Sequence, residues 1–453
     1  MKGLIFTYAM TYGGALIALY NPFYGLLVYV CFAIVRPDSM WYWSVPQGNY
    51  SRTVAVALLA GWVLQRFGRW QFGRARGVVA ALVCFWLWAV VATTFASDQE
   101  LAWGYVESIA KILLPFLVGI TVIDSVGKLK QLTWVILLSE AYVAWEFNLS
   151  YFEGYNRLWM EGFAGMDNNC HAIALVACTG LAVFVGLHES RWWLKGLAFA
   201  AALLMIHAIL FSFSRGGMLS LVVTGLVGFL LIPKKWQHYL AFAAVVLVAV
   251  RLAGPEVTAR FRTTFDSAEE RDASAQSRLK LWAGCWDSMC KRPLGVGPDH
   301  WGLIAPEYGF PRGKNAHSLW LEVGASLGFP GLGFLLLFYG LCLARLWPLT
   351  GQRHPVPDPE YRGLARMVIA SLTGFAVAAQ FVSLDRLEQS YYIALIGAGL
   401  LKLSAATPGR LPRPSAPAPP AAWATNPPRA LRFRTHNGAI PAPSGRMSTA
   451  HRA

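Results

Sequence analysis

Two arginines and one histidine are the side chains best suited to chemistry in this sequence, and each lies at the edge of an apolar stretch. Arg215 interrupts "HAILFSFSRGGMLSLVVTGLVGFLL" (207–231), and no acidic residue lies within two helical turns of it. An arginine at a membrane centre costs roughly 2.5–3.5 kcal/mol, so Arg215 needs a compensating partner. Arg278 and His317 belong to a long polar segment, 253–316, and the apolar stretch that follows it.

These three residue types suit the transfer of a group from a phosphate to a hydroxyl. The planar guanidinium of arginine binds phosphate oxygens through two parallel hydrogen bonds. A histidine titrates near neutrality and can accept the proton of an attacking hydroxyl. We therefore expect Arg215 and Arg278 to bind one lipid-linked phosphate or diphosphate, and His317 to act on a hydroxyl acceptor.

Each residue also has a simpler interpretation. Arg215 could extend to the membrane interface or cap a helix C-terminus, and Arg278 could be a surface residue of an amphipathic helix. His317 could be a helix-start residue bonded to backbone. The agreement of all three on one face favours a common site.

Two further groups of residues, amides and cysteines, could take part in the chemistry of this site. Asn168 and Asn169, beside Asp167 at the start of an apolar stretch, could bind sugar hydroxyls, and Asn315 is a candidate substrate contact two residues before His317. An equally good alternative is that Asp167 or Asn168 caps the helix that begins near Cys170. Cys285 and Cys290 form a C-x4-C pair without a nearby histidine, so no metal site and no cofactor are predicted.

The elements that position these residues are membrane-spanning helices. The chain is 56% hydrophobic and only 14% charged, whereas soluble domains carry about 25% charged residues. Short loops rich in Lys and Arg face the cytoplasm and alternate with loops on the outer face. We predict an all-α polytopic membrane protein of about twelve spanning helices, with one of the first two apolar segments re-entrant or fused to its neighbour.

Four parts are expected along the chain. They are a transmembrane bundle (1–252), an outer helical loop or cap (253–316), C-terminal transmembrane helices (317–404) and a disordered basic cytoplasmic tail (405–453). The tail is rich in Pro, Ala and Arg and has no acidic residue, which favours contact with anionic lipid over binding of nucleic acid.

The outer loop contains an apolar stripe at helical spacing. Leu279, Trp282, Trp286 and Met289 follow one another at intervals of three and four, which is typical of a helix lying in the membrane interface. Arg278 would fall in the first turn of this helix, where free backbone N–H groups favour an anion. "RPLGVGPDHW" (292–301) predicts a Pro/Gly turn folded over the site. We expect Arg278 and His317 to line one cavity that opens to lipid.

Four motifs in fixed order make the sequence resemble a known superfamily. "SFSRGG", "SRLKLW", "RPLGVGPDHW" and "NAHSLWLEVGASLGFPGLG" surround the long outer loop, as in the O-antigen ligase and polymerase superfamily. "NPFYGLLVYVCFAIVRPDSMW" and "GMDNNCHAIAL" are similar to its subgroup of exosortase-associated O-glycosylation ligases. The resemblance covers residues 1–404. It departs from the family at His317, which Ser318 follows where the family often has Asn.

The resemblance implies en bloc transfer of a glycan from undecaprenyl diphosphate to a hydroxyl of lipid A core, protein or another glycan. It implies a C-type glycosyltransferase membrane fold and a metal-independent, inverting reaction at the periplasmic face of the bacterial inner membrane. Arg215 and Arg278 match the diphosphate-binding arginines of the family, and His317 matches its essential histidine.

Other functions stay open at this stage. A polymerase would use the same arginines with a second lipid-linked acceptor. A transporter of lipid-linked glycans should show internal repeats and charged residues at the membrane midplane, and neither is found. A membrane scaffold would leave the outer arginines and histidine unexplained.

Overall fold

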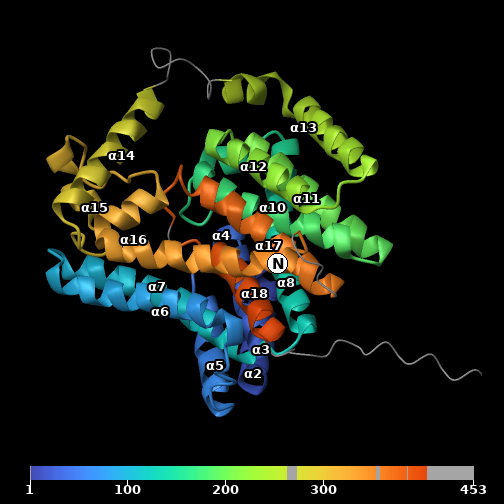
Figure 1. Cartoon of the computed structure of the whole chain (residues 1–453), viewed down its shortest axis with the longest axis horizontal. Helices are drawn as coiled ribbons and strands as arrows, with labels where there is room; N and C mark the ends of the chain where they lie inside the picture. The colour runs from blue at the N-terminus through green and yellow to red at the C-terminus, as the bar shows by residue number, and fades with distance from the viewer. Residues whose placement is uncertain (1, 263–272, 353–357, 385, 406–453) are drawn as a thin grey trace, which may run out of the picture. The chain divides into compact units, whose positions relative to one another are not determined.

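The computed structural model describes residues 2–262, 273–352, 358–384 and 386–405, and 80% of the structure is helical (Figure 1). The N-terminal helices are α1 (Lys2–Tyr8), α2 (Gly14–Tyr20), α3 (Pro22–Val35), α4 (Pro37–Met40), α5 (Tyr50–Leu64), α6 (Arg76–Ala92), α7 (Gln99–Val122), α8 (Val126–Phe152) and α9 (Arg157–Glu161). The others are α10 (Asn168–His188), α11 (Trp192–Phe211), α12 (Arg215–Leu231), α13 (Trp236–Arg262), α14 (Ala273–Lys291), α15 (Trp301–Ile304), α16 (Leu319–Leu346), α17 (Pro359–Ala378) and α18 (Glu388–Ala405).

Within the described residues, five short η segments join several of these helices. The first is a π-helix and the other four are 3₁₀ turns. They are η1 (Ala9–Gly13), η2 (Gly73–Ala75), η3 (Thr93–Phe95), η4 (Ala305–Tyr308) and η5 (Trp347–Thr350).

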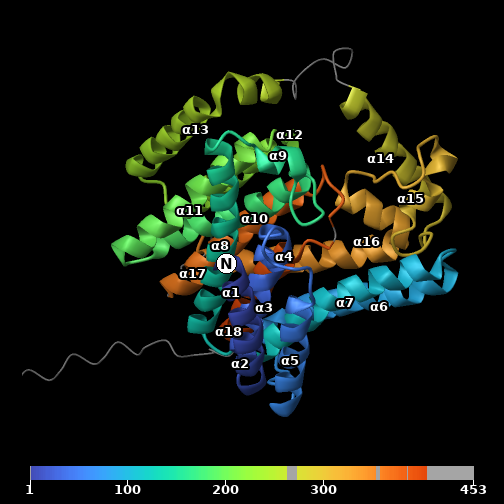
Figure 2. The ribbon, with the colours of Figure 1, turned by 180° about the vertical axis from the view of Figure 1, so that it is seen from behind.

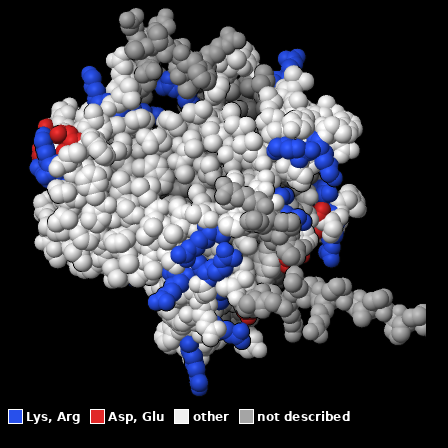
Figure 3. Space-filling view, in the orientation of Figure 1, with Lys and Arg blue, Asp and Glu red and all other residues white. Residues whose placement is uncertain are grey.

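The helices confirm an all-α polytopic membrane protein. Seven segments of the described chain are long and apolar enough to cross a bilayer, and α5 and α12 are shorter apolar helices. Much of the face in Figure 3 carries neither acidic nor basic side chains. A broad uncharged surface is expected where lipid takes the place of water. The count of about twelve spans stays a prediction.

The first two apolar segments form a helical hairpin. Asn21 leaves the helical conformation (φ −141°, ψ 99°), and its side chain caps α3 by accepting from Phe23 N–H at 3.1 Å. Pro22, at the first position of α3, cannot continue the preceding helix. Figures 1 and 2 show α2 and α3 running in opposite directions, and both 2–20 and 22–40 are candidate spans. The two segments are therefore separate helices and not one fused span, and the re-entrant alternative stays a prediction.

Small residues bring α10, α12 and α17 into close contact. A Cβ added at Gly180 of α10 would lie 2.9 Å from Ser371 Oγ of α17, and one at Gly374 of α17 would lie 2.0 Å from Thr224 Oγ1 of α12. Membrane helices pack through such small residues because their backbones can then approach closely. We call the end of the bundle where α10 and α12 begin, and where α8 and α11 finish, the site end.

The described part of 253–316 contains helices, but the buried row of its main helix differs from the predicted apolar stripe. α13 runs through residue 252 to Arg262, with a break at Gly254 (φ 69°). The predicted helix around 277–290 is confirmed as α14, which packs beside the first part of α16 (Figure 1). Its buried row is Leu281, Cys285 and Met289, whereas Leu279 and Trp286 of the predicted stripe are exposed. The residues 406–453 of the predicted tail lie outside the described residues.

The Pro/Gly turn of 292–301 fits into a break in α16. Gly328 interrupts the helix with φ 68°, and Pro330, four residues after Ser326, has no N–H to donate to the Ser326 carbonyl. The N–H groups of Val296 and Gly297 both donate to Ser326 O at 3.0 Å, and Phe329 N–H donates to Pro293 O at 2.9 Å. A side chain at Gly328 would meet Leu294 C at 2.3 Å. The predicted turn is confirmed, and it fixes the orientation of the first part of α16.

Candidate functional site

Arg215 is the first residue of α12. Ser214 caps this helix, because its Oγ accepts from Gly217 N–H at 3.2 Å. Two residues before Arg215, Phe213 has the left-handed φ of 54°, which is uncommon for a residue with a bulky side chain. A helix N-terminus presents free N–H groups and the positive end of the helix dipole to an anion. Arg215 therefore adds a full positive charge at a position that already favours phosphate.

The start of α10 holds the turn that carries Arg215. Asn168 Nδ2 donates to Ser212 O at 2.7 Å, and Asn169 Nδ2 donates to Asn168 Oδ1 at 3.2 Å. Asp167 is the N-cap, with Oδ1 accepting from Cys170 N–H at 2.7 Å. The capping alternative for Asp167 is therefore confirmed, and the amide N–H of Asn168 braces the Arg215 turn. Binding of sugar hydroxyls by Asn168 and Asn169 stays a prediction.

His317 lies close to charged groups from three segments. Burial lowers the pKa of its imidazole below the ordinary value of 6.5, and the positive charges of Arg278 and Lys314 lower it further. The carboxylate of Asp167 acts in the opposite direction and raises the pKa of His317. The charges of Arg278 in α14 and of Asp167, the N-cap of α10, thus both act on His317. At neutral pH the imidazole is uncharged and can accept a proton.

Arg278 reaches this position from the body of a helix. α14 begins at Ala273, so Arg278 lies in its second turn. The prediction that Arg278 belongs to the first turn is wrong, because the helix extends further toward the N-terminus than the apolar pattern indicated. Arg278 therefore acts through its own guanidinium, without help from free N–H groups of α14.

The backbone at His317 is held in an uncommon conformation by side chains on both sides. His317 has φ 52°, in the left-handed region that non-glycine residues rarely adopt. Ala316 N–H donates to Glu322 Oε2 at 2.8 Å, and Ala316 O accepts from Trp282 Nε1 at 3.1 Å. Strained backbone of this kind persists where the surroundings fix it, often at functional sites. Trp282 is four residues after Arg278, so one face of α14 presents both residues to the His317 segment.

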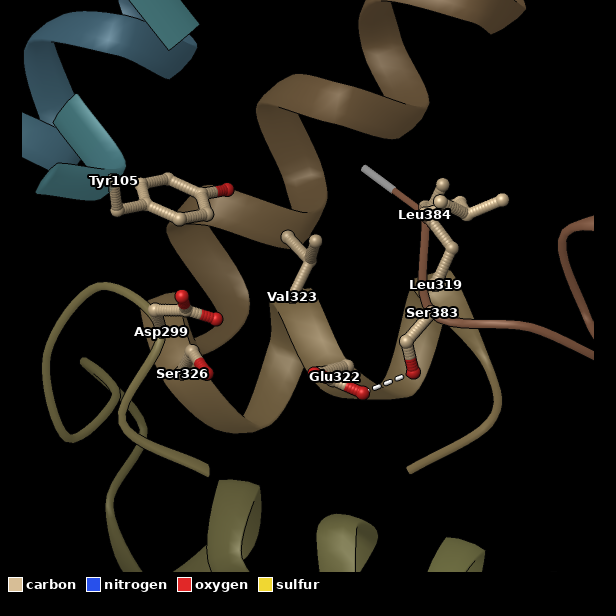
Figure 4. Close-up of a pocket in the computed structure, with 8 residues that line it drawn as sticks. All are labelled: Tyr105, Asp299, Leu319, Glu322, Val323, Ser326, Ser383 and Leu384. Carbon is tan, nitrogen blue, oxygen red and sulfur yellow. Dashed lines mark hydrogen bonds between the residues drawn. The ribbon is translucent and has the colours of Figure 1, made fainter. Parts of the chain in front are cut away.

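A small hollow lies beside this segment (Figure 4). It contains about 260 Å³ of space, and two of its walls come from the first turns of α16 and from the segment after α17. Ser383 Oγ donates to Glu322 in this hollow, as the dashed line in Figure 4 marks. The residues that line it are Tyr105, Asp299, Leu319, Glu322, Val323, Ser326, Ser383 and Leu384. Neither Arg278 nor His317 lines this hollow, and a cavity shared by these two residues stays a prediction.

The segment after α17 connects the two parts of the site. A Cβ at Gly216, next to Arg215, would lie 2.7 Å from Phe381 Cβ. Two residues later, Ser383 binds Glu322, and Leu319 N–H donates to Ala379 O at 2.9 Å. The start of α12 beside Arg215 and the first turns of α16 after His317 therefore both pack against one short stretch, 379–383.

Glu322 and Ser383 were missed from sequence. Glu322 is the single acidic residue of α16, and an acid inside an apolar stretch is a functional candidate by itself. Ser383 carries no such signal, since its importance comes only from its contact with Glu322. Asn315 is exposed, and its predicted role stays untested. Cys285 is buried and Cys290 is exposed, so the two thiols of the C-x4-C pair occupy different environments.

Fold and site together define a multi-pass helical membrane protein in which Arg215 and His317 lie at helix starts and Arg278 lies in the second turn of α14. Residues 200–337 match the O-antigen ligase family, and this stretch includes Arg215, Arg278 and His317. This match confirms the resemblance to the O-antigen ligase superfamily over that stretch of the chain. Residues 1–148 match a family of unknown function, and no curated protein matches the chain. The match to this family indicates a membrane glycosyltransferase of the ligase or polymerase type.

Proposed function

We propose that this protein transfers a glycan from a lipid diphosphate to an acceptor hydroxyl at the site end. The observation that carries the proposal is the electrostatic environment of His317, which Arg278 of α14 and Asp167 of α10 both influence. The start of α10 also holds the turn of Arg215 through the hydrogen bond from Asn168 to Ser212. Two arginines and one uncharged histidine thus serve a single reaction.

In this proposal Arg215 and Arg278 bind the diphosphate of the donor. As the bond between the sugar C1 and the diphosphate oxygen breaks, negative charge grows on the leaving group. Fixed positive groups in a water-poor site stabilise that charge without having to reorganise. The N-terminus of α12 adds its dipole on the Arg215 side. No metal or cofactor is required, since the arginines provide the positive charge.

His317 is the proposed base for the acceptor. Its uncharged imidazole takes the proton from the acceptor hydroxyl while the oxygen forms the new bond to C1. The attacking oxygen approaches opposite to the leaving diphosphate, which inverts the configuration at C1. Glu322 and Trp282 are positioning residues, because they bind the two polar groups of Ala316 and so fix the backbone before His317. Asn168, Asn169 and Asn315 are the proposed sugar contacts.

The finer features of the proposal follow from the superfamily. The donor would be undecaprenyl diphosphate, the site would face the periplasm of the bacterial inner membrane, and the acceptor would be lipid A core, protein or another glycan. Residues 253–316 would act as a cap over a bundle formed by 1–252 and 317–404. We place the protein with the exosortase-associated ligases, on the N-terminal motifs quoted above. A polymerase would differ only in using a second lipid-linked glycan as acceptor.

One reaction tests the proposal. Purified protein in lipid nanodiscs is incubated with a polyprenyl-diphosphate glycan and with lipid A core, a Ser/Thr-rich protein or a second lipid-linked glycan, in the presence of chelator. We expect one acceptor to gain the mass of the whole glycan. A gain only in the second lipid-linked glycan would make the protein a polymerase. No gain in any acceptor, or loss of activity in chelator, would contradict the proposed reaction.

A further inference from the structure

An aromatic surface that the proposed reaction does not use lies at the site end. Four rings are strongly exposed there: Tyr42 and Trp43, each 62%, Tyr155, 45%, and Trp159, 52%. They come from the segment after α4, from the connection between α8 and α9, and from α9 itself. We call these four residues the aromatic strip. Exposed aromatic groups of this extent usually mark a binding surface.

Arg157 fixes one end of the strip. Its guanidinium lies 5.4 Å from the ring centre of Tyr42 and 5.7 Å from that of Trp43. It also donates to Ser39 O at 3.1 Å and pairs with Glu161 at 3.2 Å. The Arg157 side chain is only 12% exposed, so it acts as an internal brace under exposed rings. Tyr155 OH donates to the same Glu161 at 2.8 Å.

The other end of the strip is continuous with the turn of Arg215. The ring of Trp159 packs edge-on against Phe213, with 5.7 Å between ring centres. Asn156 caps α9 by accepting from Trp159 N–H at 3.2 Å, and its Nδ2 donates to Phe211 O at 2.8 Å. Trp159 of the strip therefore contacts Phe213, which lies two residues before Arg215. From Trp159 the strip continues across α9 to Tyr42 and Trp43.

We propose that the aromatic strip binds the sugar residues of the donor glycan that lie beyond the one attached to diphosphate. This inference rests on the proposed function, because it takes the glycan of that reaction as the ligand. A sugar ring has an apolar face of C–H groups, which packs on an aromatic ring, and a rim of hydroxyls. Tyr155 OH, Glu161 and Arg157 provide polar partners beside the rings. The combination of flat apolar surface and a few fixed polar groups suits such a ligand.

The alternative occupant is the membrane interface, where exposed Trp and Tyr are common. Two features favour the glycan. Tyr42 and Trp43 are braced by a guanidinium, a rigidity that anchoring in lipid does not require. The carboxylate of Glu161, 40% exposed, lies within the strip and can accept hydrogen bonds from sugar hydroxyls.

The test compares donors of two lengths. Trp159→Ala, Trp43→Ala and the control Trp192→Ala are prepared in full-length protein in nanodiscs. Trp192 is 84% exposed and begins α11, at the end of that helix opposite to Phe211. The KM is measured for a polyprenyl diphosphate bearing one sugar and for one bearing several. We expect Trp159→Ala and Trp43→Ala to raise the ratio of the long-donor KM to the short-donor KM roughly three- to tenfold, and Trp192→Ala to leave it unchanged.

Two results would overturn the inference. The first is an equal ratio of long-donor to short-donor KM in all variants. The second is a loss of thermal stability in both Trp159→Ala and Trp192→Ala together with equal KM ratios, which would assign the strip to the membrane interface. If the wild type transfers no glycan, the proposed reaction fails, and binding alone decides the inference. Saturation-transfer NMR with dextran and chito-oligosaccharides then supports the strip if signal is lost in Trp159→Ala and kept in Trp192→Ala, and any other pattern rejects it.

Discussion

The two parts of the candidate site are constructed in different ways. Arg215 begins a membrane helix, and its turn is held by a helix cap and by the adjoining start of α10. His317 lies in a non-helical segment, and its backbone is fixed by Trp282 of α14 and Glu322 of α16. The first part depends on helix packing inside the bundle. The second depends on a few hydrogen bonds between side chains and backbone.

Because the two parts are held differently, substitutions near α12 should change the stability of the fold, whereas substitutions near His317 should change the rate of transfer. Packing around Gly374 and Thr224 holds α12 to α17, so changes there should affect the whole fold. The contacts of Ala316 fix one short segment, so changes there should affect transfer while leaving the fold intact. Each of the following predictions tests this contrast, beginning with the largest effect.

The arginines should show the largest losses. Arg215→Ala and Arg278→Ala should each remove about 2–4 kcal/mol of transition-state stabilisation, roughly a hundredfold or more in rate. Arg215→Lys and Arg278→Lys should not restore full activity, because an ammonium lacks the planar fork of the guanidinium. Single-turnover transfer measures both series, and wild-type rates in the lysine variants would reject bidentate binding of phosphate.

Overpacking the bundle should lower stability. The Cβ of Gly374→Ala would lie 2.0 Å from Thr224 Oγ1, so α12 and α17 must separate or repack. We expect a loss of about 1–3 kcal/mol in the free energy of unfolding, seen as a lower thermal midpoint. The double variant Gly374→Ala, Thr224→Ala removes the clashing oxygen and should recover much of it. Failure of this rescue would show that Gly374 matters for another reason.

The contact between α14 and the His317 segment should affect turnover alone. Trp282→Phe keeps an aromatic ring but removes the N–H that binds Ala316 O at 3.1 Å. A hydrogen bond of this kind contributes about 1 kcal/mol, so kcat should fall several-fold while donor affinity and thermal midpoint change little. Trp286→Phe is the matched control, since Trp286 lies on the exposed side of the same helix. Equal effects in the two variants would remove Trp282 from the positioning role.

The smallest effects should be shifts in the titration of His317. Transfer should rise with pH through a midpoint below 6.5, because the imidazole must lose its proton to act as base and its pKa is lowered. Asp167→Asn removes a charge that raises this pKa, so it should move the midpoint lower. Arg278→Gln removes a charge that lowers it, so NMR titration of the histidine should show a higher pKa. Shifts in the reverse directions would contradict the arrangement of charges around His317.

The sequence predicted the part of the site around Arg215 better than the part around His317, for physical reasons. A helix start such as Ser214–Arg215 follows from local residue types, since a serine cap and an apolar stretch lie next to each other. The break at Gly328 and the turn that fills it depend on residues 29 to 36 positions apart along the chain, so only the turn was predictable. Glu322 binds Ala316 and Ser383 through tertiary contacts that no local pattern indicates.

The buried face of α14 shows the same limit. Leu279 and Trp286 fit an apolar stripe, yet the packed row is Leu281, Cys285 and Met289. Both rows have helical spacing, and α16 determines which of them is covered. The existence of α14 could therefore be predicted from the sequence, whereas the side that it buries is determined by its packing against α16.

The division of labour between arginines and histidine is the central claim, and the affinity for donor tests it most directly. Binding of a polyprenyl-diphosphate glycan to nanodisc protein is measured for Arg215→Ala, Arg278→Ala and His317→Ala, together with single-turnover transfer. We predict weak donor binding in both arginine variants. In His317→Ala we predict nearly normal binding with transfer reduced by a factor on the order of 10²–10⁴. Weak donor binding in His317→Ala with normal binding in both arginine variants would contradict the assignment.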